Sequence, residues 1–288
     1  MNRKIIIAAP AKVNLTLDIK GKYPDGYHEL ETVMHHIDLL DQVTIETAPS
    51  GIEVASSSSL VPDNQDNLAY QAAELILKAY GSGEGVKIYI EKNIPVAAGL
   101  AGGSTDAAAV LTGINQLYNY GLTQEKLMEI GLKLGADIPF CLYHRTALAR
   151  GKGELLTPLE KEVKLLFVVV KPELQISTAE VYREFDLAQV EKFPDISSFL
   201  VAWNHYNIKG IAINIVNVLE SVSIKKHGEI ATIKDKLNKL GALNAVMSGS
   251  GPSVFGIFAD QKIAEQAAAL LSQEYREVFL VSSYNSAY

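Results

Sequence analysis

The sequence predicts an α+β fold in two lobes, and three observations support that class. Segments in which apolar and polar residues alternate, as in strands, are interspersed with segments of helical periodicity. These segments follow one another without the regular strand–helix–strand order of a parallel α/β protein. The 288 residues are long for one domain and sufficient for two. We therefore expect an N-terminal lobe over residues 1–157 and a C-terminal lobe over residues 158–288.

In the N-terminal lobe, periodicity and turn residues place the elements. Every second residue of 13–19 is apolar, and Pro10 separates this strand from a preceding one because proline cannot donate to a sheet ladder. Thr123 is a suitable helix N-cap. The expected elements are strands at 5–8, 13–19, 31–40, 42–47, 86–91 and 146–149, and helices at 67–80, about 105–118 and 126–134.

In the C-terminal lobe, the apolar run 165–170 predicts a fully buried strand. Two further strands, 245–247 and 254–258, are expected to form a hairpin around a glycine-containing turn. Residues 191–223 are mostly helical in character but give no clear boundaries. The remaining expected elements are helices at 177–185, 230–240 and 262–271 and a last strand at 278–284.

The composition is that of a folded globular protein, with 48% hydrophobic and 20% charged residues. The formal net charge of −7 argues against nucleic acid as a partner, because binding it requires neutralisation of phosphates by lysine and arginine. No segment approaches the ~20 apolar residues of a membrane span or the apolar core of a secretory signal. The single cysteine, Cys141, lies in an apolar run and is expected to be buried. We expect a cytoplasmic protein with no membrane partner, and both a monomer and a homodimer remain open.

The most informative segment is a glycine-rich loop between a strand and an alanine-rich helix. Glycine lets a ligand approach the backbone, and the free N–H groups of the following helix attract anions. Ser104 or Thr105 could cap that helix. The pattern is neither Walker A, because no Gly-Lys-Ser/Thr is present, nor the dinucleotide G-x-G-x-x-G. The proposed phosphate loop consists of Pro95, Val96, Ala97, Ala98, Gly99, Leu100, Ala101, Gly102, Gly103, Ser104 and Thr105.

Two simpler interpretations of the glycine segments stay open. The loop could be a glycine turn before a capped helix with no ligand. A second turn, formed by Ser248, Gly249, Ser250 and Gly251, could be an ordinary hairpin turn. Beside a phosphate loop, this second turn could instead close over a ligand.

Three stretches together resemble the signatures of the GHMP kinases, the superfamily of galactokinase and of homoserine, mevalonate and phosphomevalonate kinases. They are Pro-Ala-Lys-Val-Asn at 10–14 with Asp-Gly-Tyr-His at 25–28, the loop at 95–109, and Ser-Gly-Ser-Gly at 248–251. The resemblance runs from about residue 6 to residue 285. Within the superfamily, the first pair of motifs is most similar to the kinases that act on 4-diphosphocytidyl-2-C-methyl-D-erythritol.

This resemblance implies a fold, a reaction and cofactors. The fold would be the two-lobed GHMP-kinase fold, with an N-terminal lobe similar to ribosomal protein S5 and a C-terminal α/β-sandwich lobe. The reaction would transfer the γ-phosphoryl group of ATP to the 2-hydroxyl of the cytidine-diphospho-methylerythritol substrate, a step of non-mevalonate isoprenoid precursor synthesis. Magnesium is the expected ion.

The resemblance also implies a catalytic pair, Lys12 and Asp137. A carboxylate can take the proton of the attacking hydroxyl, and an ammonium can steady the developing alkoxide. Without the resemblance, Lys12 would be an ordinary strand-end lysine and Asp137 a turn or helix-terminus aspartate. The family pattern alone gives these two residues their catalytic interpretation.

The other site residues are implied in the same way. Tyr27 and His28 match positions that line a cytidine pocket, although alone they would be surface residues after a Pro-Asp-Gly turn. The remaining expectations are Asn14 and the turn of Ser248, Gly249, Ser250 and Gly251 as substrate contacts, Thr178 at the substrate diphosphate, and Asn67 and Lys92 at adenosine.

The sequence departs from the family pattern in two places. Thr105 replaces a usual serine and keeps the hydroxyl. Arg145, Arg150 and Lys152 stand where the pattern is less basic, which puts fine substrate specificity in doubt but not the reaction type.

Charged and titratable groups elsewhere are given structural interpretations. His35 and His36 are adjacent on a strand, so their side chains point to opposite faces and do not share a metal. Asp38 and Asp41 are expected to be solvated at a strand end. No dedicated metal-binding residues are predicted.

Three alternatives to the leading function remain. The first is a GHMP kinase for another small alcohol, such as homoserine or a mevalonate-type substrate, for which a base-stacking pair at Tyr27 and His28 would have no purpose. The second is a catalytically idle nucleotide-binding homologue, which would have no need of both Lys12 and Asp137. The third is RNA binding through the S5-like lobe, which the acidic net charge disfavours.

Overall fold

The computed structural model describes residues 3–284 of the chain. Tertiary contacts divide these residues into two compact units that are interleaved along the sequence. Unit 1 comprises the residues up to 11, 39–96 and 101–144, and unit 2 comprises 12–38, 97–100 and the residues from 145 on. The expected lobe boundary after residue 157 remains a prediction.

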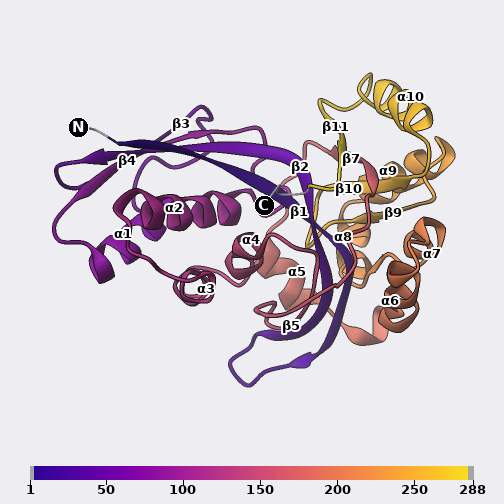
Figure 1. Cartoon of the computed structure of the whole chain (residues 1–288). Coiled ribbons are helices and arrows are strands. Elements are labelled where there is room, and N and C mark those ends of the chain that lie inside the picture. Colours follow the sequence, from indigo (N-terminus) through magenta and orange to yellow (C-terminus); the bar gives the residue numbers. More distant parts are fainter. Residues whose placement is uncertain (1–2, 285–288) are drawn as a thin grey trace. The chain divides into compact units, whose positions relative to one another are not determined.

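Unit 1 combines paired strands with four helices. The strand β3 (Ile52–Ser56) pairs in parallel with β4 (Gly85–Glu91), and β4 pairs antiparallel with the end of β2 (His28–Ala48). The helices are α1 (Leu68–Tyr80), α2 (Gly102–Tyr118), α3 (Gln124–Leu132) and α4 (Ile138–Tyr143). Figure 1 shows α1 and α2 side by side next to these strands.

Small side chains let the helices of unit 1 pack closely. Four residues of α1 and the alanine run of α2 are buried in one core with the isoleucines and valines of β2 and β4. Because the alanine side chain is small, the backbones of two helices and a sheet can approach one another closely without leaving voids. Cys141 of α4 is 1% exposed in this core, which confirms the expectation that it is a buried side chain.

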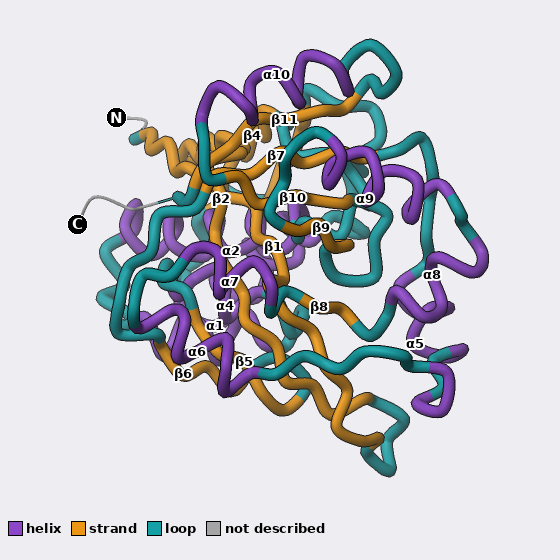
Figure 2. The backbone as a smooth tube through the Cα atoms, turned by 90° about the vertical axis from the view of Figure 1, so that its right-hand side faces the viewer, coloured by secondary structure: helices purple, strands orange, loops and turns teal. Residues whose placement is uncertain are grey.

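Unit 2 contains a four-stranded antiparallel sheet in the order β11-β7-β10-β9 (Figure 2). The strands are β7 (Leu166–Lys171), β9 (Asn244–Met247), β10 (Val254–Phe258) and β11 (Glu277–Ser282). The helices α9 (Glu229–Lys239) and α10 (Gln261–Leu271) bury their apolar faces in the same core as β7 and β10.

Unit 2 also includes parts of the two long strands β1 (Lys4–Lys22) and β2, which pair with shorter strands. Residues 30–34 of β2 pair with β5 (Ala147–Gly151), which pairs with β6 (Leu155–Pro158), and β1 pairs in parallel with β8 (Val216–Asn217). The remaining helices are α5 (Thr178–Glu184), a 3₁₀ turn (Leu187–Gln189), α6 (Ile196–Asn204), α7 (Ile208–Ile213) and α8 (Glu220–Lys226).

Most predicted elements are confirmed, including the hairpin of β9 and β10 and the Thr123 cap of α3. Four corrections stand out. Pro10 does not divide the first strand, because a proline interrupts a strand only where its missing N–H would have been a donor. The two strands expected over 31–47 form one strand, β2, and the short β3, β6 and α4 were not expected. Ser104 and Thr105 do not cap α2, which begins after Ala101.

Within residues 3–284, none of the helices has the length and apolar character needed to cross a bilayer.

Candidate active site

The predicted phosphate loop adopts an unusual backbone. Ala97, Gly99 and Ala101 have φ values of 53°, 75° and 58°, in a region that residues with a side chain seldom occupy. The last of these residues immediately precedes α2 and provides no side-chain hydrogen bond to the helix start. The first-turn N–H groups of α2 are therefore not occupied by a capping side chain, which suits an anion site.

The middle of this loop is fixed by residues of unit 2. The Ala98 carbonyl accepts from the Ser253 N–H at 3.3 Å and the Leu100 carbonyl accepts from the Lys12 N–H at 3.1 Å. Between them, the Gly99 carbonyl accepts from the Ser248 hydroxyl at 3.0 Å. Three consecutive carbonyls are thus engaged, and the structure brings the two predicted glycine segments into contact.

Lys12 and Asn14 lie two residues apart on β1 and so project from the same face. The Lys12 ammonium donates to Asn14 Oδ1 at 2.7 Å, and its residue is only 4% exposed. Asn14 Nδ2 in turn donates to the Thr32 hydroxyl at 2.9 Å, and the Asn14 N–H reaches Ser248 Oγ at 3.4 Å. The neighbouring amide and hydroxyls hold the ammonium in a defined position.

Asp137 is in unit 1, at the position that immediately precedes α4. Its carbonyl accepts from the Cys141 N–H at 3.1 Å, and its side chain makes no capping bond to the helix. The residue is half-buried. The helix is started by the backbone of Asp137, so its carboxylate is not used for capping.

The serine–glycine turn at 248–251 is held by side chains from other parts of unit 2. Asn217 Nδ2 donates to the carbonyls of Met247 and Gly249, at 2.8 and 2.7 Å. Ser250 Oγ lies 2.7 Å from Thr178 Oγ1, at the start of α5. The structure therefore brings Thr178 into hydrogen-bonding distance of the turn.

Tyr27 and His28 follow a tight turn, where the Tyr27 N–H bonds to Asp25 Oδ1 at 3.1 Å. The Tyr27 ring is exposed, and Lys152 Nζ lies 4.1 Å from its centroid while pairing with Asp25 at 2.6 Å. A cation over a ring face restrains both groups. Lys152, which departs from the family pattern, is thus a neighbour of the predicted cytidine residues.

The His28 imidazole lies against two aromatic rings of the α5 segment. Its centroid is 5.4 Å from that of Tyr182 and 6.2 Å from that of Phe185. Burial, helped by the nearby Lys22, lowers the pKa of His28, so the neutral form of the ring predominates at pH 7. A neutral imidazole offers one donor and one acceptor, which is the hydrogen-bonding character of a nucleobase partner.

The residues predicted at adenosine have structural partners in unit 1. Asn67 is the N-cap of α1: its Oδ1 accepts from the Ala69 N–H at 2.8 Å and its Nδ2 donates to the Pro62 carbonyl at 2.6 Å. The Lys92 ammonium lies between the carboxylates of Asp41 and Asp106. Asp41 is fully buried, so the expectation of a solvated strand-end aspartate was wrong.

The sequence did not predict the side chains that surround two of the expected site residues, His28 and Lys92. Tyr182 and Phe185 lie three residues apart at the end of a predicted helix, and this spacing was the available signal. Asp41 and Asp106 had no local signal, because their partner Lys92 is 51 and 14 residues away in the chain.

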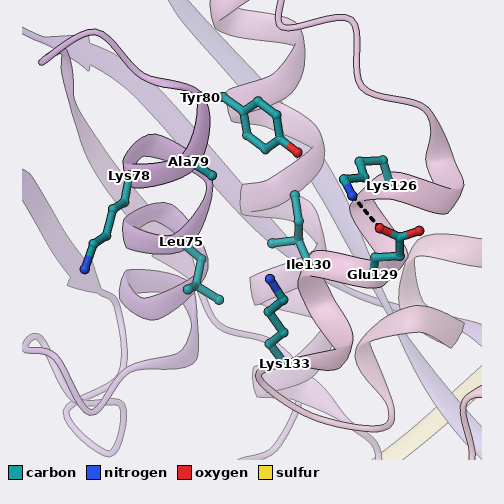
Figure 3. A pocket seen from close by; sticks show the side chains of 8 residues that line it. All are labelled: Leu75, Lys78, Ala79, Tyr80, Lys126, Glu129, Ile130 and Lys133. Carbon is teal, nitrogen blue, oxygen red and sulfur yellow. Dashed lines mark hydrogen bonds and ion pairs between the residues drawn. The ribbon is translucent and has the colours of Figure 1, made fainter.

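Unit 1 also contains a surface pocket of about 240 Å³ between α1 and α3 (Figure 3). Leu75 of α1 faces Ile130 and Lys133 across it, Lys78 points away from them, and Lys126 pairs with Glu129 at its edge. None of the predicted site residues lines this pocket. We therefore assign the candidate active site from the loop and its hydrogen bonds rather than from this cavity.

Family models match both halves of the chain. The GHMP kinases N-terminal domain matches residues 67–145, and the GHMP kinases C-terminal domain matches residues 202–277. The chain is 60% identical over 284 residues to a 4-diphosphocytidyl-2-C-methyl-D-erythritol kinase of Syntrophomonas wolfei, covering 99% of this chain and 100% of that protein. It is 44% identical to a kinase of the same name from Alkaliphilus metalliredigens, with 98% of each chain covered.

Comparison with solved structures also shows similarity to kinases over almost the whole chain. A crystal structure of 4-(cytidine 5'-diphospho)-2C-methyl-D-erythritol kinase superposes with a TM-score of 0.85 at 34% identity, over 98% of this chain and 100% of that chain. A homoserine kinase from Cytophaga hutchinsonii superposes with a TM-score of 0.79 at 18% identity, over 98% and 95% of the two chains, and this likeness concerns the fold alone.

Proposed function

The chain belongs to the GHMP kinase family, and we propose that it transfers the γ-phosphoryl group of ATP to the 2-hydroxyl of 4-diphosphocytidyl-2-C-methyl-D-erythritol. The shared name of full-length relatives at 44–60% identity supports this proposal. The structural observation that carries the substrate class is the aromatic group around His28, where Tyr182 and Phe185 approach a neutral imidazole. A nucleobase can use such a group, whereas a small alcohol has no ring to place there.

In the proposed reaction, the 2-hydroxyl oxygen attacks the γ-phosphorus and forms the new O–P bond. The bond from the γ-phosphorus to the β,γ-bridging oxygen breaks, and ADP leaves with that electron pair. Asp137 accepts the hydroxyl proton and Lys12 balances the negative charge on the attacking oxygen. Because phosphoryl transfer depends mainly on positioning and charge stabilisation, no covalent enzyme intermediate is required.

The loop from Pro95 to Thr105 is proposed to hold the triphosphate through the backbone N–H groups at the start of α2. Among residues 3–284 there is no group of three or more histidine, cysteine, aspartate or glutamate side chains that could hold a metal ion. We propose that Mg²⁺ arrives with ATP, because this ion commonly keeps several waters and is held largely by substrate phosphates rather than by a cage of protein ligands. Magnesium would supply charge neutralisation on the triphosphate.

The substrate is proposed to lie along unit 2, with its cytidine at Tyr27 and His28 and its diphosphate near Thr178. The hydroxyl pair of Thr178 and Ser250, 2.7 Å apart, offers donors for diphosphate oxygens. Asn14 is proposed to contact the methylerythritol part. Asn67 and Lys92 remain the proposed neighbours of adenosine, and a cytoplasmic location and a monomer or homodimer remain expectations.

The experiment that tests the function is an ADP-release assay with Mg·ATP and the cytidine-diphospho-methylerythritol substrate. The wild type is compared with Asp137→Asn and with a control, Asp235→Asn, at an exposed position of α9. We expect turnover in the wild type and control, and a loss of at least 100-fold in Asp137→Asn, because general-base catalysis contributes about 10²–10⁴-fold.

Each result decides between the proposals. Turnover that is equal in all three proteins would keep the kinase and remove Asp137 as its base. A folded wild type that binds ATP but turns over only homoserine or a mevalonate-type alcohol would replace the substrate. Binding of ATP without turnover of any of these alcohols would favour a catalytically idle homologue.

A further inference from the structure

Unit 1 contains a buried cluster of three charged side chains next to the start of α2. Lys92, which follows β4, donates to Asp106 Oδ2 at 2.8 Å and to the carboxylate of Asp41 on β2. The three side chains are 4%, 3% and 0% exposed. Charges this deeply buried are costly unless they are paired, so the arrangement has to serve a purpose or be fully satisfied.

The two carboxylates are not equally satisfied. Asp41 Oδ1 accepts two backbone N–H groups, from Asn93 at 2.6 Å and Ile94 at 2.9 Å, in addition to the lysine on its other oxygen. Asp106 Oδ1 is buried and accepts no hydrogen bond within the described part of the chain. One ammonium thus faces two carboxylates, and Asp106 has fewer hydrogen bonds than Asp41 to offset the cost of its burial.

The cluster lies directly against the proposed phosphate-binding turn. A Cβ added to Gly102, the first residue of α2, would lie 3.2 Å from Lys92 Nζ and 3.1 Å from Ile94 Cγ2. Asp106 belongs to the same helix, four residues further on. Lys92 therefore connects β2, β4 and α2 at the end of the helix from which the phosphate-binding N–H groups project.

We propose that Lys92 and Asp106 are positioning residues for nucleotide binding, which fasten the first turn of α2 and set its local charge. The inference rests on the proposed function of the loop. Neither residue needs to touch the triphosphate, because its charge acts on the bound anion from a distance. When Asp106 is ionised, the three side chains of the cluster have a net charge of −1, which repels the anion. When Asp106 is protonated, the cluster is neutral.

The charge of Asp106 changes in the physiological range. Burial raises the pKa of Asp106 to about 7, although Lys92 opposes the shift and Asp41 adds to it. These are the charged groups that face Asp106 from β4 and β2. The helices packed against α2 contribute apolar side chains to this core, among them Ala69 and Ala72 of α1 and Ile138 of α4. We expect the affinity for ATP to fall about two- to fivefold as Asp106 ionises, the size of a charge effect at a helix terminus.

The first test compares the dissociation constant of Mg·ATP at pH 6, 7 and 8 in the wild type, Asp106→Asn and a control, Asp235→Asn, at the exposed position of α9. Asparagine keeps the shape of Asp106, removes the charge and leaves the pair of Lys92 with Asp41. The ionisation of ATP itself is common to all three proteins and cancels in the comparison. We expect tighter binding by Asp106→Asn than by the wild type at pH 8, no difference at pH 6, and wild-type behaviour of the control.

Equal pH profiles for the wild type and Asp106→Asn would overturn the proposal. The same would follow if Asp106→Asn changed only the melting temperature, because the residue would then have a purely structural role. The measurement is direct binding of ATP, so it remains valid if the alcohol substrate is a different one. Failure of the proposed function would show as absence of ATP binding by the wild type.

A second test examines the lysine. Lys92→Met leaves two buried carboxylates without a cation, and we expect lower stability and weaker ATP binding. The double variant Lys92→Met/Asp106→Asn should recover part of both losses, because only one buried carboxylate remains. The control Lys87→Met, on β4, removes an exposed ion pair with Glu53 of β3 and should change neither stability nor ATP binding. If the change in the double variant equals the sum of the changes in the two single variants, for stability and for ATP binding, the proposed coupling between Lys92 and Asp106 is contradicted.

Discussion

At the scale of single residues, the site depends on close approaches of backbone to backbone. Gly99 has a φ of 75°, and a Cβ added to it would lie 2.4 Å from the Ser248 carbonyl oxygen. No side chain fits that space, and both partners are backbone atoms that cannot rotate away. The hydrogen bond from Ser248 Oγ to the Gly99 carbonyl depends on this approach. The glycine is therefore required by the contact itself and not only by the turn.

We predict that Gly99→Ala lowers the stability by roughly 1–3 kcal/mol and weakens ATP binding, because the loop must move away from the Ser248 turn. Chemical denaturation and calorimetric titration with Mg·ATP measure the two effects. The matched stability control is Gly103→Ala, whose added Cβ would meet only Leu68 Cδ1 at 3.5 Å, an ordinary contact. Its stability should be unchanged or slightly raised, as for alanine in a helix. Equal stability of the two variants would contradict the argument.

At the scale of elements, the proposed adenosine contact Asn67 also has a structural task. It caps α1 through the Ala69 N–H and is 94% buried, with a 6% exposed fraction. Asp260 also caps its helix, α10, because its side-chain oxygen accepts from the Ile263 N–H at 3.0 Å, and it is not among the proposed ligand contacts. The two caps are chemically alike, so a comparison separates the cost of losing a cap from the cost of losing a ligand contact.

We predict that Asn67→Ala and Asp260→Ala each lower the free energy of unfolding by about 1 kcal/mol, the usual cost of losing a cap. Only Asn67→Ala should also raise the KM for ATP, with a smaller change in kcat, because a lost ground-state contact affects binding first. Urea denaturation and steady-state kinetics measure these quantities. If the KM for ATP is the same in both variants, Asn67 has a capping role only.

The elements show what the sequence could predict and what it could not. Helices with a clear apolar stripe and cap, such as α1 and α3, and the hairpin after residue 244 follow local rules and were predicted nearly at their bounds. The continuity of β1 through Pro10 was missed, because it depends on which side of the strand has a partner. The short β3 and β6 have few residues to carry a periodic pattern.

The candidate site residues likewise fall into those with a local sequence signal and those without one. The glycine loop and the Ser248 turn carry their own signal, and the structure places them in contact. Lys12 and Asp137 have no local signal beyond the family pattern, and their shared role stays a proposal. Buried Asp41 was misjudged, because its burial depends on Lys92 and on the N–H groups of residues 93 and 94, more than 50 residues later in the chain.

At the scale of the whole molecule, each ligand that binds the native state stabilises it against unfolding. The gain is about 2.7 kcal/mol at a ligand concentration of 100 times Kd. For a chain of this size, that gain corresponds to a rise of about 4–5 °C in Tm. Thermal unfolding therefore reports binding without requiring turnover, and it can separate the nucleotide from the second substrate.

We predict that Mg·ATP and the cytidine-diphospho-methylerythritol substrate each raise the Tm of the wild type, whereas homoserine and mevalonate do not. In His28→Ala, the rise with Mg·ATP should persist and the rise with the cytidine ligand should fall sharply, because the imidazole that packs against Tyr182 and Phe185 is removed. His205→Ala, at the end of α6, is the matched control and should respond to both ligands as the wild type does. A rise with the cytidine ligand that survives in His28→Ala would place the base elsewhere. A rise with homoserine or mevalonate would support the alternative substrate class, because only a ligand that prefers the native state can shift this equilibrium.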